Sequence, residues 1–525
     1  MRALAPAVAV LVAASGVGCR PRTAPGSATL LVGRASDAIG LDPSRISDSE
    51  SVEVCEQIFE HLVRTRPGSS EIEPALATDW SPSPDGREWI FHLRPGVRFH
   101  DGTPFDAEAV VFSFERQRDQ KHPFHLPDFT YEGLFKNIVR VEAVDKLTVR
   151  IVIVEAYAPL EANLSMFPMS IVSPTAVRRW GEAFRRHPVG TGPFRFVEWS
   201  EGERITLEAN PDYWDGTPAL GHLAFVPVRD PRQRLLALEG GAIDVAENLA
   251  PQDLQFVVLH PELTTERVAG FNIGYLAMNT QHPPFSDPRV RRAVQLAIRR
   301  DPILKLVYQG LAVPATGPLS PSVWGHLDLP MEAPDPARAR ALLAEAGVIG
   351  PGADPTRRKP RFFVMSTPRT YMPNPERVAS MIAQDLHDAG LDVEVVVNVM
   401  SDHLDAIHRG EHDLCLLGWS ADNGDPDNIL YTLFHSDNTQ EGVARNVAFL
   451  RDKKLDGILS WAQRAPERRQ RERFYQDAQR LIAEDRPWVP LAHTEIVAAR
   501  RASVHGLRLP PTSTLYFNRV TLDPP

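Results

Sequence analysis

Residues 361–399 alternate between strand-like and helix-like stretches, and few folds accept that order. An apolar run at 361–367, RFFVMST, leads into a helical pattern at 376–390, ERVASMIAQDLHDAG, and a second apolar run follows at 391–399, LDVEVVVNV. Short apolar runs bounded by Pro or Gly are typical of buried strands, whereas apolar positions three to four residues apart are typical of a helix. A similar unit begins at 412–419, HDLCLLGW. The chain is therefore predicted to be an α/β protein.

The same alternation runs through the rest of the 525 residues. A hairpin is expected at 87–102, then a helix over 107–119 capped by Asp106, and a second hairpin at 139–154. Domains usually hold about 100–200 residues, so this length suggests two to four core-forming units. We expect mixed strands divided between at least two lobes.

The first residues of the chain have the layout of a targeting signal. An apolar stretch after Arg2 is shorter than the ~20 residues of a membrane span, and small residues then lead to Cys19. This layout predicts a signal peptide at 1–18. The junction before Cys19 resembles a bacterial lipobox, so Cys19 is expected to be lipidated and residues 19–28 to form a tether; an ordinary signal peptide cleaved nearby is the alternative. We expect the rest of the chain to work in the periplasm or cell envelope.

Composition argues against several classes of function. The formal charge of −10 disfavours a protein that binds nucleic acid by neutralising phosphates. The chain has no Walker P-loop, no G-x-S-x-G nucleophile elbow and no His-Glu-x-x-His zinc motif. Its three cysteines are not spaced as metal ligands, and Cys55 and Cys415 are expected to be buried free thiols. No metal or cofactor is predicted, while a hydrolase with dispersed catalytic residues stays open.

Two loops that follow strand patterns offer charged groups for recognition. In STPRTYMPNP, Arg369 lies among prolines that stiffen the loop, and an Arg guanidinium can bind a carboxylate through two hydrogen bonds. In GWSADNGDPDN, Asp425 precedes a proline and is predicted to cap a helix, which leaves Asp422 and Asn423 free. A cation and an anion that face one cavity would suit a zwitterion such as a dipeptide. Trp419, in the second loop, could equally wall a pocket or pack in the core.

Long stretches of the chain resemble the extracytoplasmic solute-binding proteins of ABC importers, in the peptide/nickel family. The matching stretches are EPALATDWSPSPDGREWIFHLRPGVRFHDGTPFDAEAVVFSFERQ, PVGTGPFRF, NPDYW, GYLAMNT, VRRAVQLAI, ARALLAEAGV and GWSADNGDPDN. The stretches FSFERQRDQKHPFH, PRTYMPNP and GWSADNGDPDN look most like the dipeptide-binding branch. The resemblance implies that Arg369 binds the peptide carboxylate and Asp422 the amino terminus. It places Tyr371, Trp419 and Tyr131 near the ligand.

The resemblance also implies a fold and its division along the chain. The fold is the type II periplasmic-binding-protein fold, in which two lobes are joined by a hinge and an extra subdomain is inserted in lobe one. The implied segments are 1–18 signal peptide, 19–28 lipidated tether, 29–70, 188–285 and 495–525 lobe one, 71–187 the inserted subdomain, and 286–494 lobe two.

Taken together, these observations favour a non-enzymatic binding protein. We expect a lipid-anchored monomer that captures dipeptides or short peptides between its lobes and delivers them to an ABC permease. The chain lacks the aromatic residue that dipeptide binders often carry near Met400 and the cysteine pairs that some of them have. Binders of glutathione, haem, nickel complexes or longer peptides therefore remain alternatives, as does a sensory lipoprotein that serves a chemoreceptor.

Overall fold

The computed structural model describes residues 28–523, apart from residues 130, 352, 355 and 357. Cys19 and the predicted signal peptide lie outside the described residues. Within the described residues, no helix is both long and apolar enough to cross a bilayer.

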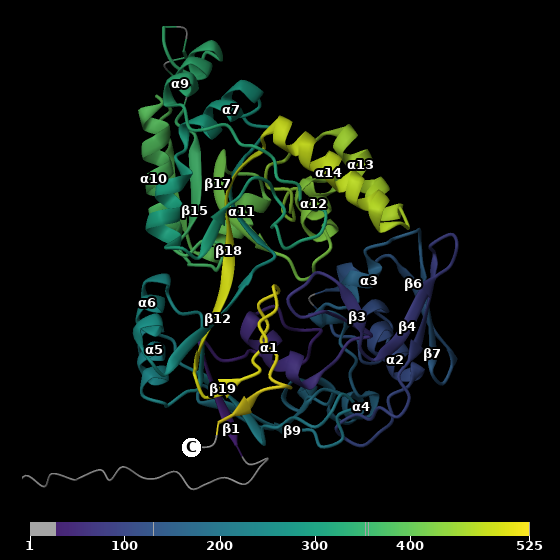
Figure 1. Cartoon of the computed structure of the whole chain (residues 1–525). Coiled ribbons are helices and arrows are strands. Elements are labelled where there is room, and N and C mark those ends of the chain that lie inside the picture. Colours follow the sequence, from purple (N-terminus) through teal and green to yellow (C-terminus); the bar gives the residue numbers. More distant parts are fainter. Residues whose placement is uncertain (1–27, 130, 352, 355, 357, 524–525) are drawn as a thin grey trace, which may run out of the picture.

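One twelve-stranded sheet runs through most of the molecule, in the order β16-β15-β17-β13-β18-β11-β1-β10-β9-β8, with β12 and β14 also paired to β18 (Figure 1). Its strands are β1 (Thr29–Arg34), β8 (Phe194–Ser200), β9 (Arg204–Ala209), β10 (His222–Pro227), β11 (Val245–Glu247), β12 (Leu263–Ala269), β13 (Asn272–Met278), β14 (Ala312–Pro314), β15 (Arg361–Met365), β16 (Glu394–Asn398), β17 (Leu414–Ser420) and β18 (Trp488–Arg501). Parallel and antiparallel pairs occur in it, as predicted.

A four-stranded antiparallel sheet, β4-β5-β7-β6, forms a separate subdomain on the right of Figure 1. Its strands are β4 (Ala77–Pro82), β5 (Glu88–Leu93), β6 (Ile138–Asp145) and β7 (Thr148–Ile153). Two short pairs complete the strands: β2 (Val63–Thr65) with β3 (Ile72–Pro74), and β19 (Val504–His505) with β20 (Thr521–Leu522).

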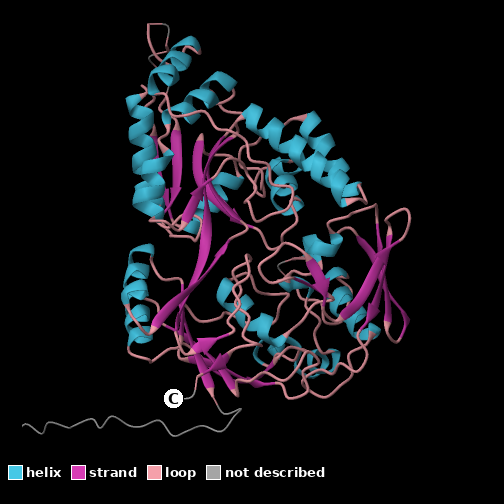
Figure 2. Ribbon diagram, viewed as in Figure 1, coloured by secondary structure: helices cyan, strands magenta, loops and turns pink. Residues whose placement is uncertain are grey.

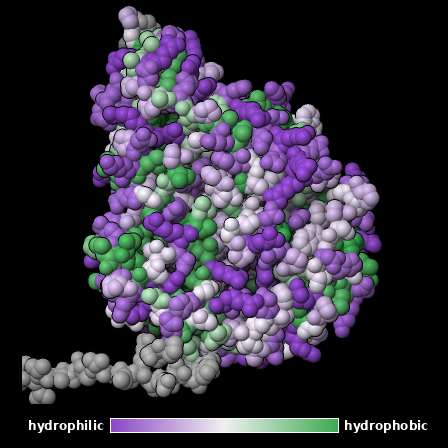
Figure 3. Space-filling view, in the orientation of Figure 1, coloured by the Kyte–Doolittle hydropathy of each residue, from purple (hydrophilic) through white to green (hydrophobic). Residues whose placement is uncertain are grey.

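The helices cover the faces of these sheets (Figure 2). They are α1 (Ser49–Ile58), α2 (Ala107–Arg118), α3 (Leu160–Asn163), α4 (Pro174–Trp180), α5 (Pro231–Glu239), α6 (Pro251–Leu259), α7 (Pro288–Ala297), α8 (Arg300–Ile303), α9 (Pro336–Glu345), α10 (Pro375–Asp388), α11 (Met400–His408), α12 (Asp427–Phe434), α13 (Lys453–Arg464) and α14 (Arg468–Asp485). Most of their exposed side chains are hydrophilic, but an apolar patch lies over α5 and α6, where Leu236, Val258 and Leu259 are exposed (Figure 3).

The second lobe is built on β13 to β17 and the first part of β18. All seven residues of β13 are buried, and they alternate between two hydrophobic cores. Leu276 and Met278 pack in the core with α7, α9 and α10, whereas Ile273 and Tyr275 pack in the core with α11 to α14. Two buried faces explain why β13 and β17 are apolar at nearly every position. The strand pairing of this lobe begins at Asn272, within the segment predicted as lobe one.

The first lobe is built on β1, β8 to β12 and the last part of β18, and it carries the four-stranded sheet beside it. α1 packs against one face of its sheet, while α5 and α6 pack against the other. The inserted subdomain comprises β4 to β7 with α2, α3 and the loops between these elements. The predicted boundaries at residues 70, 187, 285 and 494 stay predictions.

The lobes are joined where β12 continues into β13 and where β18 runs from one lobe into the other. The buried side chain of Asn272 ties these two crossings together. Its Oδ1 accepts a hydrogen bond from the backbone N–H of Thr494 at 2.8 Å, and its Nδ2 donates to the carbonyl oxygen of Thr494 at 3.1 Å. These paired strands form the hinge.

The hairpin predicted at 87–102 is wrong. β5 lies between β4 and β7, so both of its edges are already paired. Residues that follow it form a tight turn instead, in which Phe99 N–H donates to Thr103 O at 2.9 Å. The hairpin predicted at 139–154 is confirmed as β6 and β7, and the helix capped by Asp106 is confirmed as α2.

Candidate ligand-binding site

Both predicted recognition loops leave the same edge of the sheet. β15 and β17 are parallel neighbours, with Phe363 opposite Cys415. The carboxyl ends of parallel neighbours meet at one edge, where α/β proteins commonly bind ligands. The loop with Arg369 follows β15, and the loop with Asp422 follows β17. The structure therefore brings these two loops to one edge of the second lobe.

Tyr371 fixes the first loop onto the sheet. Gly274 of β13 and Gly418 of β17 lie opposite each other, and Tyr371 passes over both. A Cβ on Gly418 would lie 2.1 Å from Cδ2 of Tyr371, and a Cβ on Gly274 would lie 2.5 Å from its carbonyl oxygen, so only glycine allows this approach. The hydroxyl of Tyr308 donates to the same carbonyl oxygen at 3.0 Å. Tyr371 is buried, and burial raises its pKa to about 12.

Arg369 is exposed above this anchored tyrosine. Its backbone exchanges two hydrogen bonds with Met372, at 3.0 and 2.9 Å, which closes a tight turn. Its positive charge acts to lower the pKa of Tyr371, so the guanidinium lies near that ring. Among the described residues it has no ion-pair partner. The guanidinium is thus held on a fixed backbone and is free to meet an anion.

Asp422 combines accessibility with a perturbed pKa. Its side chain is exposed to solvent, yet surrounding protein raises its pKa to about 6. The protein around the carboxyl group disfavours its charged form, and a cation placed beside it would favour that form again. Asp422 is therefore placed to receive a cation.

Tyr131, from the inserted subdomain side of the molecule, lies near Asp422. Burial raises the pKa of Tyr131 to about 12, and the charge of Asp422 contributes to that rise. The ring packs edge-on against Phe167, with centroids 5.1 Å apart. The two halves of the molecule thus each present a polar group at this boundary.

Trp419 is half-buried and oriented by a hydrogen bond. Its Nε1 donates to Oδ1 of Asn428 at 3.0 Å, while its ring packs on the core of the second lobe. The structure shows its packing on the core, while its role as the wall of a ligand pocket stays a prediction.

Asp425 has the structural role that was predicted for it, although α12 begins later than expected, at Asp427. The carboxylate accepts from the N–H of Asp427 at 3.0 Å and pairs with Arg471 at 2.7 Å. Asn423, in contrast, was predicted to be free and is fully buried. Its amide donates to Oδ1 of Asn163 in the inserted subdomain at 2.9 Å.

Two charged residues at this site had no signal in the sequence. Arg445 acts to lower the pKa of Tyr131 and Asp48 acts to raise it, so both lie near the ring. Arg445 is exposed in a loop without a recognisable motif, and Asp48 is the N-cap residue of α1, a position that by itself indicates only a structural role. Only the folded chain brings them to Tyr131.

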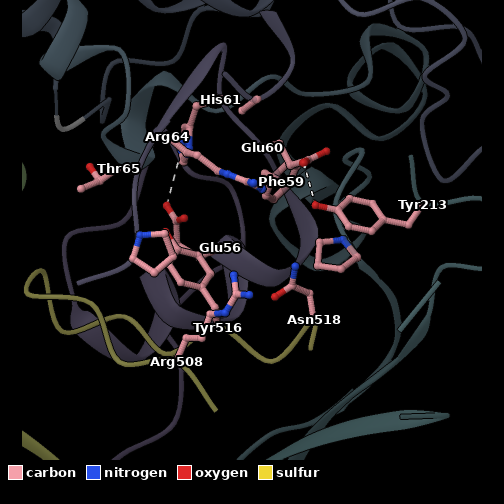
Figure 4. A pocket seen from close by; sticks show the side chains of 13 residues that line it. Glu56, Phe59, Glu60, His61, Arg64, Thr65, Tyr213, Arg508, Tyr516 and Asn518 are labelled. Atoms are coloured by element: carbon pink, nitrogen blue, oxygen red, sulfur yellow. Dashed lines mark hydrogen bonds and ion pairs between the residues drawn. The ribbon is translucent and has the colours of Figure 1, made fainter. Parts of the chain in front are cut away.

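A separate cavity of about 60 Å³ lies between α1, β2 and the C-terminal segment (Figure 4). The carboxylate of Glu60 accepts three hydrogen bonds there, from the hydroxyls of Thr191 and Tyr213 and from Nε1 of Trp214, at 2.8, 3.0 and 2.9 Å. Burial raises the pKa of Glu56 to about 8, and Glu56 lies 3.4 Å from Nε2 of His61. None of the predicted site residues lines this cavity, and its carboxylates serve the packing of the first lobe.

The cysteines and the possible metal ligands give no sign of a second site among the described residues. Cys55 and Cys415 are buried free thiols, as predicted, and burial raises the pKa of both. In the part of the chain that the structure describes, no three His, Cys, Asp or Glu side chains gather as a metal site.

Comparison with known proteins gives consistent relatives. Residues 71–441 match the family model of the bacterial extracellular solute-binding proteins, family 5. Di/tripeptide-binding protein 2 of Pseudomonas aeruginosa is 36% identical over 94% of this chain and 95% of its own length. Heme-binding protein A of Haemophilus influenzae is 33% identical over 93% and 91%.

Solved structures show the same fold. The periplasmic binding protein DppA from Helicobacter pylori, in complex with the peptide STSA, superposes with a TM-score of 0.80 and 32% identity, over 95% of this chain and 98% of that one. The predicted fold, the type II periplasmic-binding-protein fold with two lobes and a hinge, is thereby confirmed. The chain belongs to the bacterial extracellular solute-binding proteins of family 5.

Proposed function

We propose that this protein binds dipeptides or short peptides between its lobes and delivers them to the permease of an ABC importer. The observation that carries the proposal is that the loops with Arg369 and Asp422 follow two parallel neighbouring strands, β15 and β17, and so leave one edge of the sheet, where both side chains are exposed. A peptide ammonium group suits that carboxylate, and Arg369 at the same sheet edge suits the peptide carboxylate. Relatives named for di- and tripeptides support this choice of ligand.

Each site residue is assigned a role in ligand binding. Arg369 binds the ligand carboxylate and Asp422 binds its amino terminus. Tyr371 anchors the loop that carries Arg369, while Trp419 and Tyr131 wall the site from the two lobes. The side chains of the ligand are not specifically recognised, because binding depends on the two charged ends of the peptide.

The protein is further proposed to act without catalysis, as a monomer. Its place is the periplasm or cell envelope, held to a membrane through lipid on Cys19. Binding proteins, not enzymes, are what its relatives are named for, and this supports the first point.

The proposal is tested by calorimetry with the purified protein and a small dipeptide library. C-amidated and N-acetylated dipeptides should each bind about 10- to 150-fold more weakly than the free dipeptide, because each loses a charge-assisted contact. Arg369→Gln should remove the preference for a free carboxylate, and Asp422→Asn the preference for a free amine.

Two exposed charged residues of the second lobe serve as controls. Arg377→Gln and Asp402→Asn change the same charges on exposed helix starts and should leave affinity unchanged. Equal affinity for free and blocked dipeptides would refute the assigned roles. Tight binding of haem with no dipeptide binding would favour the second candidate, which Heme-binding protein A suggests.

A further inference from the structure

The loop that carries Asp422 is tied to the inserted subdomain by a continuous set of hydrogen bonds. Asn423 Nδ2 donates to Asn163 Oδ1 at 2.9 Å, Asn163 Nδ2 donates to the Tyr157 hydroxyl at 3.0 Å, and that hydroxyl donates to Asp427 Oδ2 at 3.2 Å. Tyr157, Asn163, Asn423 and Asp427 are called the latch below. It crosses from the second lobe to the inserted subdomain and back again.

Two of the four latch residues are buried, and Tyr157 and Asn163 are half-buried. Asn423 is 0% exposed and Asp427 is 6% exposed. Asn423 is fixed at both ends, because its Oδ1 also accepts from the N–H of Asp425 at 2.9 Å. Separation of the lobes takes the Tyr157 hydroxyl away from Asp427 and the Asn163 oxygen away from Asn423. Each of the two keeps a partner in its own lobe, Gln463 for Asp427 and the N–H of Asp425 for Asn423. Buried polar groups that lose a partner are costly, so the closed latch is favoured.

The backbones also approach closely beside the latch. A Cβ on Gly424 would lie 2.4 Å from the Cβ of Ser70, so a larger residue would push the lobes apart. Further along, the N–H of Ala158 donates to the carbonyl oxygen of Gln463 at 2.7 Å. That amide belongs to the inserted subdomain and its acceptor to α13, so its protection reports whether the lobes are in contact.

We propose that Tyr157 and Asn163 are positioning residues that hold the Asp422 loop in its binding position by closing the latch. The inference rests on the proposed function for its ligand. Asn423 follows Asp422 directly, so a ligand bound to Asp422 and a closed latch favour the same arrangement of one loop. Apparent affinity then scales with the fraction of molecules whose latch is closed.

A nearby ion pair at the same boundary provides the matched control. Arg464 and Glu155 lie 2.8 Å apart, with side chains 54% and 51% exposed. Exposed pairs of this kind contribute little, so Glu155→Gln should leave closure nearly unchanged. Like Tyr157, Glu155 connects the inserted subdomain to the second lobe, but its ion pair is exposed whereas the hydrogen bonds of the latch are more buried.

The experiment measures hydrogen exchange at Ala158 and dipeptide affinity in the same variants. Without ligand, Tyr157→Phe and Asn163→Ala should exchange faster at Ala158 than the wild type, while Glu155→Gln should match it. Both latch variants should weaken dipeptide binding about tenfold, and Glu155→Gln less than about twofold. Melting temperatures confirm that each variant is folded.

Two results would overturn the inference: latch variants that exchange like Glu155→Gln, or weaker binding with no change at Ala158. A wild type that binds no dipeptide would overturn the proposed function instead. The exchange comparison without ligand still decides the latch in that case, because it needs no ligand.

Discussion

Asp422 carries the chemistry of the candidate site because its surroundings hold its pKa near 6 while water still reaches it. A carboxylate of this kind gains from an ammonium partner, because the partner's charge offsets the cost that the surrounding protein places on the charged form. The same surroundings make it sensitive to mild acid, which an ordinary surface aspartate is not.

Dipeptide affinity should therefore fall as the pH drops through 6. Protonated Asp422 cannot pair with an ammonium group, so the dissociation constant should rise about tenfold between pH 7 and pH 5. Calorimetry at three pH values measures this change. The Asp422→Asn variant should bind weakly at every pH, and a wild-type affinity that stays constant would remove Asp422 from ligand contact.

Sequence could predict the residues that follow strands and could not predict those brought in from afar. Asp422 and Arg369 stand after apolar runs, where an α/β fold places ligands. Arg445 and Asp48 meet Tyr131 only through tertiary packing, and no local pattern marks them. The buried role of Asn423 was missed because its partner, Asn163, lies 260 positions away.

At the scale of the elements, the loop that carries Tyr371 packs directly on β13 and β17 because the two strands have paired glycines at that position. Elements built from neighbouring segments were predictable, such as the strand–helix–strand unit of β15, α10 and β16. The partners of β5 were not, since β7 lies far along the chain and its pairing leaves no trace near β5.

Gly418→Ala should destabilise the protein and weaken dipeptide binding together. The added methyl group would lie 2.1 Å from Tyr371 and would push away the loop that carries Arg369. Overpacking of this kind costs about 1–3 kcal/mol. Thermal unfolding and calorimetry measure the two effects.

Gly457→Ala is the control for this change. Gly457 lies within α13 and nothing approaches its Cβ position within 4 Å. Alanine there should stabilise the protein by about 0.5–1 kcal/mol, because it favours the helix. If Gly418→Ala also stabilised the protein, the side chain of Tyr371 would have to move away from the added methyl group at little cost in free energy.

At the scale of the whole molecule, Glu56 of α1 and Tyr516 of the C-terminal segment line the same cavity (Figure 4). Its pKa of about 8 lies above the ordinary value of 4.5, so the folded state keeps a proton that the unfolded chain releases. The stability from Glu56 is thus complete below pH 4.5 and is lost as the pH rises through 8.

Glu56→Gln should therefore become more stable relative to the wild type as the pH rises from 5 to 9. The difference in melting temperature between the two proteins, measured across this range, gives the answer. Glu376→Gln, on the exposed start of α10, should show a constant difference. A constant difference for Glu56→Gln as well would mean that Glu56 is not buried as the structure shows.

β18 belongs to the sheets of both lobes, and it is the last long strand of the chain. The ribosome makes residues 488–501 after all the strands of the twelve-stranded sheet with which they pair, so neither lobe can complete its sheet before β18 has been made. Folding of both lobes must then wait for the synthesis of β18. A protein of an extracellular family gains from that order, because a chain that has not yet folded can still be threaded through a membrane.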